Sequence, residues 1–305
     1  MRSRFPLPVR LAQLAQALPD FVGRDTLVTS LLALEACYPD ETIEGTFGGG
    51  LRFAGNPARD RNTLVLALQR FCRPSLTAVL EAALGAGGVF ADVGGHLGMY
   101  ALCAARLVGP GGRVESFEPD PQAAEALRRN AALNAVPQLA VNERAVGAEP
   151  GSVRLVRLPR TTGLTSRYTI RDGEEFEARV TTLDLHFAGR RPPDLVKVDV
   201  EGMEHEVLRG ARGLLSSGRP PAVVFEANAR FFEAAGTSYR GVLAWLEEAG
   251  GYAVFALTPR GLRREPPGCE SPGSLNVLAL RGGHEPHERV LEQLRRTRFP
   301  KNLND

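Results

Sequence analysis

The pattern of apolar and polar positions changes at about residue 88. From there on, short continuous apolar runs alternate with stretches whose apolar residues recur at helical spacing. Continuous apolar runs suit strands covered on both faces, and strand–helix alternation favours a parallel, doubly wound α/β sheet with helices on either side. The expected strands are 89–91, 114–117, 139–141, 195–198 and 222–225, and the expected helices between them are 99–107, 122–133 and 204–215.

The flanking segments follow other patterns. Residues 1–85 are mainly helical in spacing, except for alternating residues around Gly48–Gly49–Gly50 that predict a small hairpin. Near the end of the chain, two strand-like runs separated by a turn-rich loop are expected to pair antiparallel at one edge of the sheet. These outer helices are expected near 11–18, 27–34, 62–70, 74–84, 239–248 and 288–295, the hairpin strands at 42–47 and 51–54, and the edge strands at 252–257 and 275–280.

The chain is therefore expected to have three parts. These are a helical and hairpin extension over 1–85, a ligand-binding α/β domain over 86–283, and a C-terminal tail over 284–305. Residues 159–173, rich in Thr, Gly, Arg and Ser, interrupt the sheet between its third and fourth strands. A loop of this length is mobile or forms a lid, so we expect this loop and the N-terminal extension to cover the substrate.

Composition excludes several classes of partner. The 305 residues are 43% hydrophobic and 24% charged, as in a globular protein, and a net charge of +2 gives no reason to expect nucleic-acid binding. No apolar run predicts a signal peptide or a membrane span. The spacing of the four cysteines fits neither a zinc site nor a disulfide framework. We therefore expect a cytoplasmic protein that binds neither nucleic acid nor membrane; a homodimer is left open.

Acidic residues gather where the expected strands end. In an open α/β sheet, ligands bind at the carboxyl ends of the strands, so these residues should share one rim. The polar residues at or just after the strand ends are Asp92, Glu118, Asp199, Glu201, Glu226 and Asn228.

The first strand runs into a glycine-rich loop, Asp92 to Gly98. Gly94 and Gly95 have no Cβ to obstruct a ligand, and Gly98 opens the following helix. We expect the loop to present its N–H groups and a positive helix end to an anionic group. His96 stands where a dinucleotide loop has its second glycine, which weighs against pyrophosphate and favours a smaller cofactor with an amino-acid head.

These segments together resemble the FkbM family of methyltransferases. The likeness runs from about residue 60 to 228, in the same order, and as a set it is specific. The segments that carry it are Asp92–Tyr100, Phe117–Pro121, Leu127–Asn130, Ala145–Gly147, Thr182–Asp184, Val196–Glu204 and Glu206–Ala211. The loop departs from the family pattern D-V-G-A-N-x-G, because Gly95–His96 replace Ala–Asn. We interpret His96 as a substitute for the amide.

The resemblance implies a class I methyltransferase fold with a mostly parallel seven-stranded sheet and S-adenosylmethionine as cofactor. It implies methyl transfer to oxygen of a small natural product or sugar-containing acceptor, with nitrogen of an amino sugar or similar amine as the alternative. The loop would hold the methionine part of the cofactor, Glu118 the ribose, and the region 143–146 the adenine. The implied cofactor residues are Asp92, Gly94, Gly95, His96, Gly98, Tyr100, Glu118, Pro119, Ala145 and Asp199.

Transfer to a hydroxyl needs a nearby base, and Asp199 is the first candidate because it ends the strand beside the loop. Glu201 and Glu226 come next, and Lys197 is interpreted as an anchoring residue. Asp199, Glu226 and Asn228 also offer oxygen ligands for Mg²⁺ or Mn²⁺, but transfer without a metal is favoured.

Two other readings stay open at this stage: a nicotinamide-dependent oxidoreductase and a non-catalytic binding module on the same fold. The glycine loop and Glu118 suit a nicotinamide enzyme too. Among the histidines of the domain, His205 is expected to be solvated, and His186 has no partner visible in the sequence.

Overall fold

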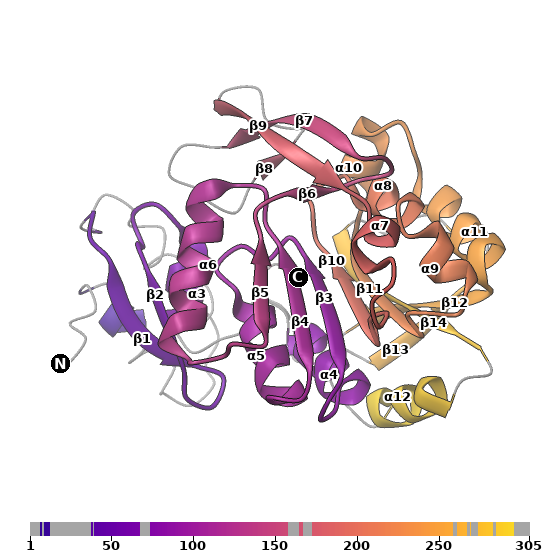
Figure 1. Cartoon of the computed structure of the whole chain (residues 1–305), viewed down its shortest axis with the longest axis horizontal. Helices are drawn as coiled ribbons and strands as arrows, with labels where there is room; N and C mark the ends of the chain where they lie inside the picture. The colour runs from indigo at the N-terminus through magenta and orange to yellow at the C-terminus, as the bar shows by residue number, and fades with distance from the viewer. Residues whose placement is uncertain are drawn as a thin grey trace.

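The main sheet has eight strands in the order β13-β12-β14-β11-β10-β3-β4-β5 (Figure 1). The computed structural model describes residues 7, 9–12, 38, 40–67, 74–157, 165–166, 173–258, 261–266, 269, 274–282 and 285–295. The strands of this sheet are β3 Val89–Val93, β4 Arg113–Phe117, β5 Leu139–Asn142, β10 Leu195–Val198, β11 Ala222–Asn228, β12 Tyr252–Thr258, β13 Gly261–Glu265 and β14 Ser274–Arg281. All expected strands of the sheet are confirmed.

The five strands from β5 to β11 are parallel, and β14 pairs antiparallel with β12, as the sequence predicted. The strand β14 also pairs antiparallel with β11. The sheet has one strand more than expected, because β13 forms inside the connection between the two edge strands. Its sequence, Gly-Leu-Arg-Arg-Glu, has no apolar run, since the edge position leaves its middle residues exposed or half-buried. The mostly parallel, doubly wound α/β fold is confirmed.

Alternate residues of each strand enter two separate cores. On β3, Phe90 packs into one core, and Val89 and Ala91 pack into the other. The first core is covered by α4 Pro74–Ala83, α5 Met99–Val108, α6 Pro121–Leu133 and α12 Glu285–Arg295. The second is covered by α7 Leu183–Phe187, α8 Glu204–Arg209, α9 Arg212–Ser216, α10 Ala229–Ala234 and α11 Tyr239–Gly250.

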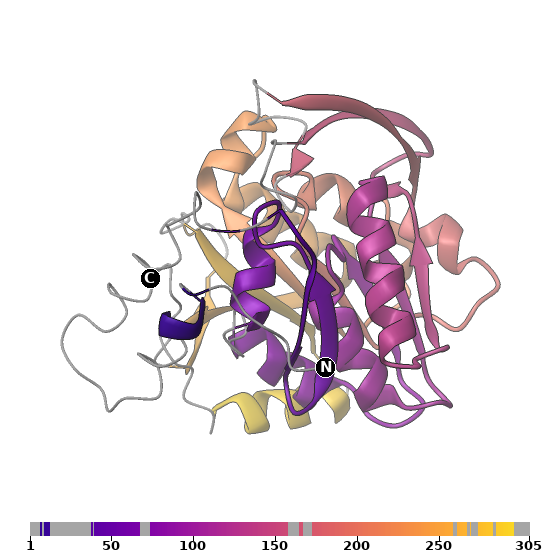
Figure 2. The same cartoon turned by 90° about the vertical axis from the view of Figure 1, so that its left-hand side faces the viewer.

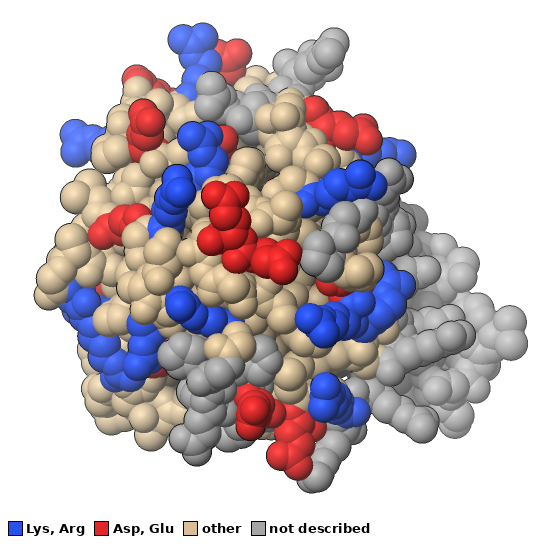
Figure 3. Space-filling model, turned by 90° about the vertical axis from the view of Figure 1, so that its right-hand side faces the viewer, with Lys and Arg blue, Asp and Glu red and all other residues tan. Residues whose placement is uncertain are grey.

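The helix expected over 204–215 is split into α8 and α9. The carboxylate of Asp184 accepts hydrogen bonds from the N–H groups of Gly213 and Leu214 (2.7 and 2.8 Å), which supports a new helix start there. On the side of the molecule that carries α11, Lys and Arg side chains are interspersed with Asp and Glu (Figure 3). Within the described part of the chain, every helix falls short of the length and apolar character that a membrane crossing needs.

The expected hairpin is confirmed as β1 Ile43–Phe47 and β2 Leu51–Gly55, followed by α3 Arg61–Ala67. It lies beside α6 (Figure 2). The Arg52 N–H donates to Asn134 Oδ1 on that helix at 2.8 Å, and Asn134 Nδ2 donates back to the Arg52 carbonyl at 2.7 Å. The helices expected at 11–18 and 27–34 lie almost entirely outside the described residues, although residues 9–12 are helical.

A second sheet, which the sequence did not predict, lies above the carboxyl ends of the main strands (Figure 1). Its strands are β6 Ala145–Val146, β7 Gly151–Arg157, β8 Thr165–Ser166 and β9 Glu174–Thr181, in the order β6-β9-β7-β8. The strand β9 has mainly exposed and half-buried side chains and begins with acidic residues, which hid it from the apolar pattern. The proposed lid over 159–173 lies outside the described residues, except for Thr165, Ser166 and Gly173.

Candidate active site

The glycine loop follows β3, at the point between β3 and β10 where the order of the strands in the sheet reverses. The strands β3 and β10 are neighbours, and the Asp199 N–H donates to the Val93 carbonyl at 3.0 Å. A Cβ on Gly94, whose φ is 86°, would lie 1.9 Å from the Asp199 carbonyl oxygen, and one on Gly95 would lie 2.1 Å from Ser116 Oγ. The two glycines are therefore needed because neighbouring strands occupy the space, which corrects the expectation that they clear room for a ligand.

The N–H groups of this loop are used inside the protein. Those of Gly94 and Gly95 both donate to the Phe117 carbonyl at 3.0 Å, and that of His96 donates to Glu118 Oε2 at 2.8 Å. The expectation that these groups face an anionic ligand is therefore wrong for these three residues. An anionic group would be met further along, at the first turn of α5.

Glu118 is buried at the end of β4 and held from two sides. Its Oε2 accepts the N–H of His96, and its Oε1 accepts the N–H of Asp120 at 3.0 Å. Burial raises the pKa of this carboxyl group, while the His96 charge and the two N–H donors oppose the rise. Each carboxylate oxygen keeps further acceptor capacity, so the group can still bind the two neighbouring hydroxyls of a ribose. This donor set fits the sugar of an adenosyl cofactor.

Lys197 on β10 anchors the base of the site. Its ammonium lies 3.1 Å from Asp92 Oδ1, donates to the Gly94 carbonyl at 3.1 Å, and lies 3.7 Å from Asp199 Oδ2. It also lies 5.3 Å from the centre of the Tyr100 ring. Burial raises the pKa of Asp92, and the charge of Lys197 opposes that rise. The interpretation of Lys197 as an anchor agrees with these contacts.

Three carboxylates meet on the rim beside the loop. One oxygen from each of Asp199, Glu201 and Glu226 lies within 4.8 Å of the others; Asp199 and Glu201 are half-buried, and Glu226 is buried. Negative charges so close repel one another, so a proton, a metal cation or a cationic ligand among them lowers their electrostatic energy. The Oδ1 of Asn228 accepts the N–H of Arg230 at 3.2 Å and caps α10.

Glu204 supports this cluster, and the sequence reading gave it no role. Its buried carboxylate accepts the N–H groups of Val200 and Gly202 at 3.1 and 3.0 Å and so holds the turn that carries Asp199 and Glu201. Burial, with the charge of Asp199 adding to it, raises the pKa of Glu204 to about 7. Glu204 is an acidic residue in the first turn of α8, where negative charge is favoured, and this preference is the signal that could have revealed it.

The remaining expected residues lie around this core of the site. Gly98 precedes α5, and the buried Tyr100 lies in its first turn; Pro119 is half-buried between Glu118 and Asp120.

Ala145, on β6, packs with Met203 and Leu155 in a small core under the second sheet. Arg157, missed by the sequence reading, is buried there and binds Asp120 Oδ1 at 2.6 Å. The second sheet is thus tied to the loop that follows Glu118.

Both histidines of the expected domain core differ from expectation. His186 Nε2 lies 3.2 Å from Glu115 Oε2, so it has a partner on the neighbouring strand β4. His205 is half-buried, with its ring edge against Trp245 at 6.2 Å between centres, rather than solvated. Burial lowers the pKa of His205. Neither histidine belongs to the cluster of three carboxylates.

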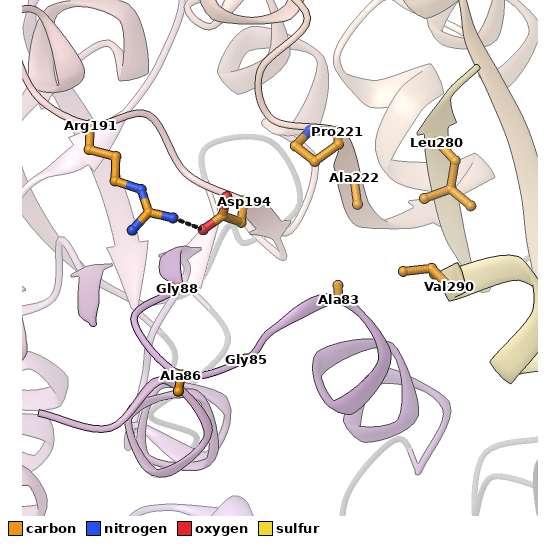
Figure 4. A pocket seen from close by; sticks show the side chains of 10 residues that line it. All are labelled: Ala83, Gly85, Ala86, Gly88, Arg191, Asp194, Pro221, Ala222, Leu280 and Val290. Carbon is orange, nitrogen blue, oxygen red and sulfur yellow. Dashed lines mark hydrogen bonds and ion pairs between the residues drawn. The ribbon is translucent and has the colours of Figure 1, made fainter. Parts of the chain in front are cut away.

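A pocket of about 290 Å³ lies at the other end of the parallel strands from the acidic rim (Figure 4). Apolar side chains line it together with the ion pair of Arg191 and Asp194, whose N···O distance is 3.0 Å. Asp194 Oδ2 also accepts the N–H of Val89 at the start of β3. Because the pocket lies at the amino end of this parallel strand, it is separate from the rim that carries the acids.

Comparison with known proteins gives one family and two curated relatives. Residues 92–252 match the family described as the methyltransferase FkbM domain. The 31-O-demethyl-FK506 methyltransferase FkbM of Streptomyces tacrolimicus is 35% identical over an alignment of 155 residues; the match covers 41% of this chain and 59% of that protein. Methyltransferase 1 of Beauveria bassiana (strain ARSEF 2860) is 29% identical over an alignment of 142 residues; the match covers 39% of this chain and 56% of that protein. The matched parts are thus less than two thirds of either relative.

Two solved structures overlap with most of the fold. The precorrin-6y C5,15-methyltransferase of Geobacter metallireducens is 16% identical with a TM-score of 0.40, over 68% of this chain and 87% of that one. The TehB-like SAM-dependent methyltransferase of Corynebacterium glutamicum is 12% identical with a TM-score of 0.41, over 72% and 94%.

Proposed function

This chain belongs to the FkbM methyltransferase family, and we propose that it transfers the methyl group of S-adenosylmethionine to an oxygen of a small-molecule acceptor. Membership confirms the resemblance seen in the sequence, the class I methyltransferase fold and the cofactor. It also sets aside the nicotinamide-dependent oxidoreductase. The relative from Streptomyces tacrolimicus acts, by its name, on 31-O-demethyl-FK506, which supports oxygen as the acceptor atom here.

The observation that carries the proposal is the meeting of Asp199, Glu201 and Glu226 beside the glycine loop. S-adenosylmethionine, when bound, supplies a methyl group that is already activated, so much of the catalytic work is positioning. A hydroxyl acceptor must also lose its proton as its oxygen forms the new bond to carbon. The Asp199 carboxylate receives that proton. Lys197 fixes the place of Asp199, because its ammonium lies 3.7 Å from Oδ2.

Glu201 and Glu226 give the acceptor side of the site its chemistry. Their carboxylates accept hydrogen bonds from further hydroxyls of the acceptor and orient the reacting one. A site rimmed by three acids suits a neutral, hydroxyl-rich molecule, such as a sugar or a sugar-containing natural product, and disfavours anionic acceptors.

The same cluster supports one alternative. Three close carboxylates attract a protonated amine, so an amino sugar or similar amine is the second candidate acceptor. An amine must lose its own proton before it can attack, and Asp199 would again receive it.

The test separates cofactor binding from transfer. Binding of S-adenosylhomocysteine is measured by calorimetry, and transfer is measured with a panel of polyols, sugars, amino sugars and hydroxylated macrolides. For Asp199→Asn we expect kcat to fall about 100-fold or more, with the affinity for S-adenosylhomocysteine within about threefold of wild type. The control is Glu206→Gln, which removes a nearby half-buried acid on α8 outside the cluster.

Full activity of Asp199→Asn would remove the role given to Asp199. Transfer to amines alone would favour the second candidate. Tight binding of S-adenosylhomocysteine with no transfer to any class in the panel would instead favour a non-catalytic binding module on this fold.

A further inference from the structure

The N-terminal extension reaches the cofactor loop at the side chain of His96. Asp60, just before α3, places Oδ2 3.6 Å from His96 Nε2. Asn62, in the first turn of α3, places Nδ2 3.3 Å from His96 Nδ1. Both ring nitrogens of a cofactor-loop residue therefore face side chains that lie more than 30 residues earlier in the chain.

The same tautomer of the His96 ring satisfies both contacts. The side-chain nitrogen of Asn62 carries hydrogens and donates, so Nδ1 of His96 accepts. The hydrogen of the ring then lies on Nε2, which faces the carboxylate of Asp60. A carboxylate on one nitrogen and an amide donor on the other fix both the tautomer and the orientation of an imidazole.

The burial of the Asp60 carboxylate beside His96 is itself unfavourable in free energy. Its side chain is 4% exposed, and burial raises its pKa while the hydrogen bonds from the Asn62 N–H and the Thr63 hydroxyl oppose that rise. A buried carboxylate is unfavourable unless it is paired and hydrogen-bonded. Its Oδ1 accepts the N–H of Asn62 at 2.9 Å and so caps α3, which leaves Oδ2 for the ring of His96 and the hydroxyl of Thr63.

A second link joins the extension to the next residue of the loop. The fully buried Asn130 of α6 accepts the N–H of Ala54 on β2 at 2.8 Å and donates to the Leu97 carbonyl at 2.9 Å. Residues 96 and 97 are thus both held by contacts that begin in the extension. This link involves neither Asp60 nor Asn62, so it supports the same conclusion independently.

The backbone of His96 explains why such support is needed. Its φ of 47° lies in the left-handed region, which is unfavourable for a non-glycine residue. In this conformation its N–H donates to Glu118 Oε2 at 2.8 Å. A released side chain would let the backbone relax and take that donor away from the carboxylate that faces the ribose.

We propose that Asp60 and Asn62 are positioning residues of the cofactor site: they hold His96 in the conformation that orients Glu118, and so set the affinity for the cofactor. The inference rests on the proposed function only in that this loop and Glu118 bind S-adenosylmethionine. It gives the N-terminal extension a part in cofactor binding, beside the cover over the acceptor that the sequence predicts.

The experiment is a double-mutant cycle read by calorimetry with S-adenosylhomocysteine. Asp60→Asn keeps an oxygen to cap α3 but removes the charge that faces His96. His96→Ala removes the ring and leaves a residue that rarely adopts the left-handed conformation. We expect each variant to bind about tenfold more weakly, because each loses the electrostatic contact between the Asp60 carboxylate and the His96 ring. With His96→Ala already present, Asp60→Asn should add less than about twofold.

Steady-state kinetics and a matched control separate positioning from general damage. For Asp60→Asn, KM for S-adenosylmethionine should rise about as much as binding weakens, with kcat at saturation nearly unchanged. The control, Asp40→Asn, breaks the ion pair with Arg59 (2.7 Å) in the same extension without touching the loop, and should bind as wild type does.

Three results would overturn the inference. The first is wild-type affinity in a folded Asp60→Asn variant, and the second is additive losses in the double mutant. Equal weakening by Asp40→Asn would also overturn it, because the effect would then belong to the extension as a whole. If the wild-type chain binds S-adenosylhomocysteine but methylates nothing, the proposed function is contradicted and the present inference is not, because this experiment measures binding.

Discussion

Lys197 on β10 stands directly opposite Asp92 on β3, and their side chains form a buried ion pair of 3.1 Å beneath the glycine loop. Only two residues of the chain are lysine, and the other is Lys301 near the C-terminus. A compact ammonium on a flexible stem can reach Asp92, the Gly94 carbonyl and Asp199 at once, which the planar guanidinium of arginine would not do in the same space.

Loss of this lysine should be costly. Lys197→Met leaves the charge of Asp92 buried without its partner, so we expect the free energy of unfolding to fall by about 3–5 kcal/mol. Chemical denaturation measures the loss. The double variant Asp92→Asn with Lys197→Met should recover part of it, because no charge is then buried. Equal instability of the single and double variants would show that the pair is not what Lys197 stabilises.

Gly94 should tolerate no side chain. Gly94→Ala places a Cβ 1.9 Å from the Asp199 carbonyl oxygen at a φ of 86°, so the loop or β10 must move. We expect a loss of about 3 kcal/mol or more in unfolding free energy, with weaker binding of S-adenosylhomocysteine. Gly111→Ala is the matched control, because no atom lies within 4 Å of its added Cβ. Similar behaviour of the two variants would refute the packing role.

Protonation of Glu115 should make the stability of the fold depend on pH in the acidic range. Burial alone disfavours its charged form, but hydrogen bonds from His186, Asn142 and Arg113 outweigh this and lower its pKa from 4.5 to about 2. A carboxyl group whose pKa is lower in the folded than in the unfolded protein stabilises the fold at pH values above its unfolded pKa. This contribution is therefore lost as pH falls from about 4.5 to about 2. Melting temperatures across this range measure it.

The comparison for this pH effect is Glu115→Gln, which should flatten the profile over the same range and be less stable at neutral pH. Glu125→Gln on the surface of α6 serves as the control, since Glu125 is exposed and lies 3.8 Å from Arg128. An unchanged acid profile in Glu115→Gln would mean that other carboxylates cause the loss.

Methyl transfer should survive removal of divalent cations. The ammonium of Lys197 already supplies a positive charge 3.7 Å from Asp199, and Asn228, one of the expected ligands, caps α10. We therefore expect less than about twofold loss of kcat after exhaustive chelation, far below the effect of removing a catalytic group. Activity that disappears with the chelator and returns with Mg²⁺ or Mn²⁺ would instead assign Asp199, Glu201 and Glu226 to a metal site.

The strands of the main sheet could be predicted because burial on both faces leaves a run of apolar residues. Leu195–Val198 and Ala222–Phe225 are fully buried, and their runs show it. The strands β9 and β13 have few buried side chains, so their apolar signal is weak. The break between α8 and α9 was not predictable from spacing, since Asp184, nearly 30 residues away, supports the second helix start.

The sequence by itself determined the family, the cofactor loop and the acids at the strand ends, because parallel strands place their carboxyl ends on one rim. Only the tertiary structure decided which of these groups meet. It brought Glu201 together with Asp199 and Glu226, and gave Gly94 a packing role against β10. It also brought Asp60 to His96. Such contacts join residues far apart in the chain, and their distances depend on how the elements pack, which no local pattern encodes.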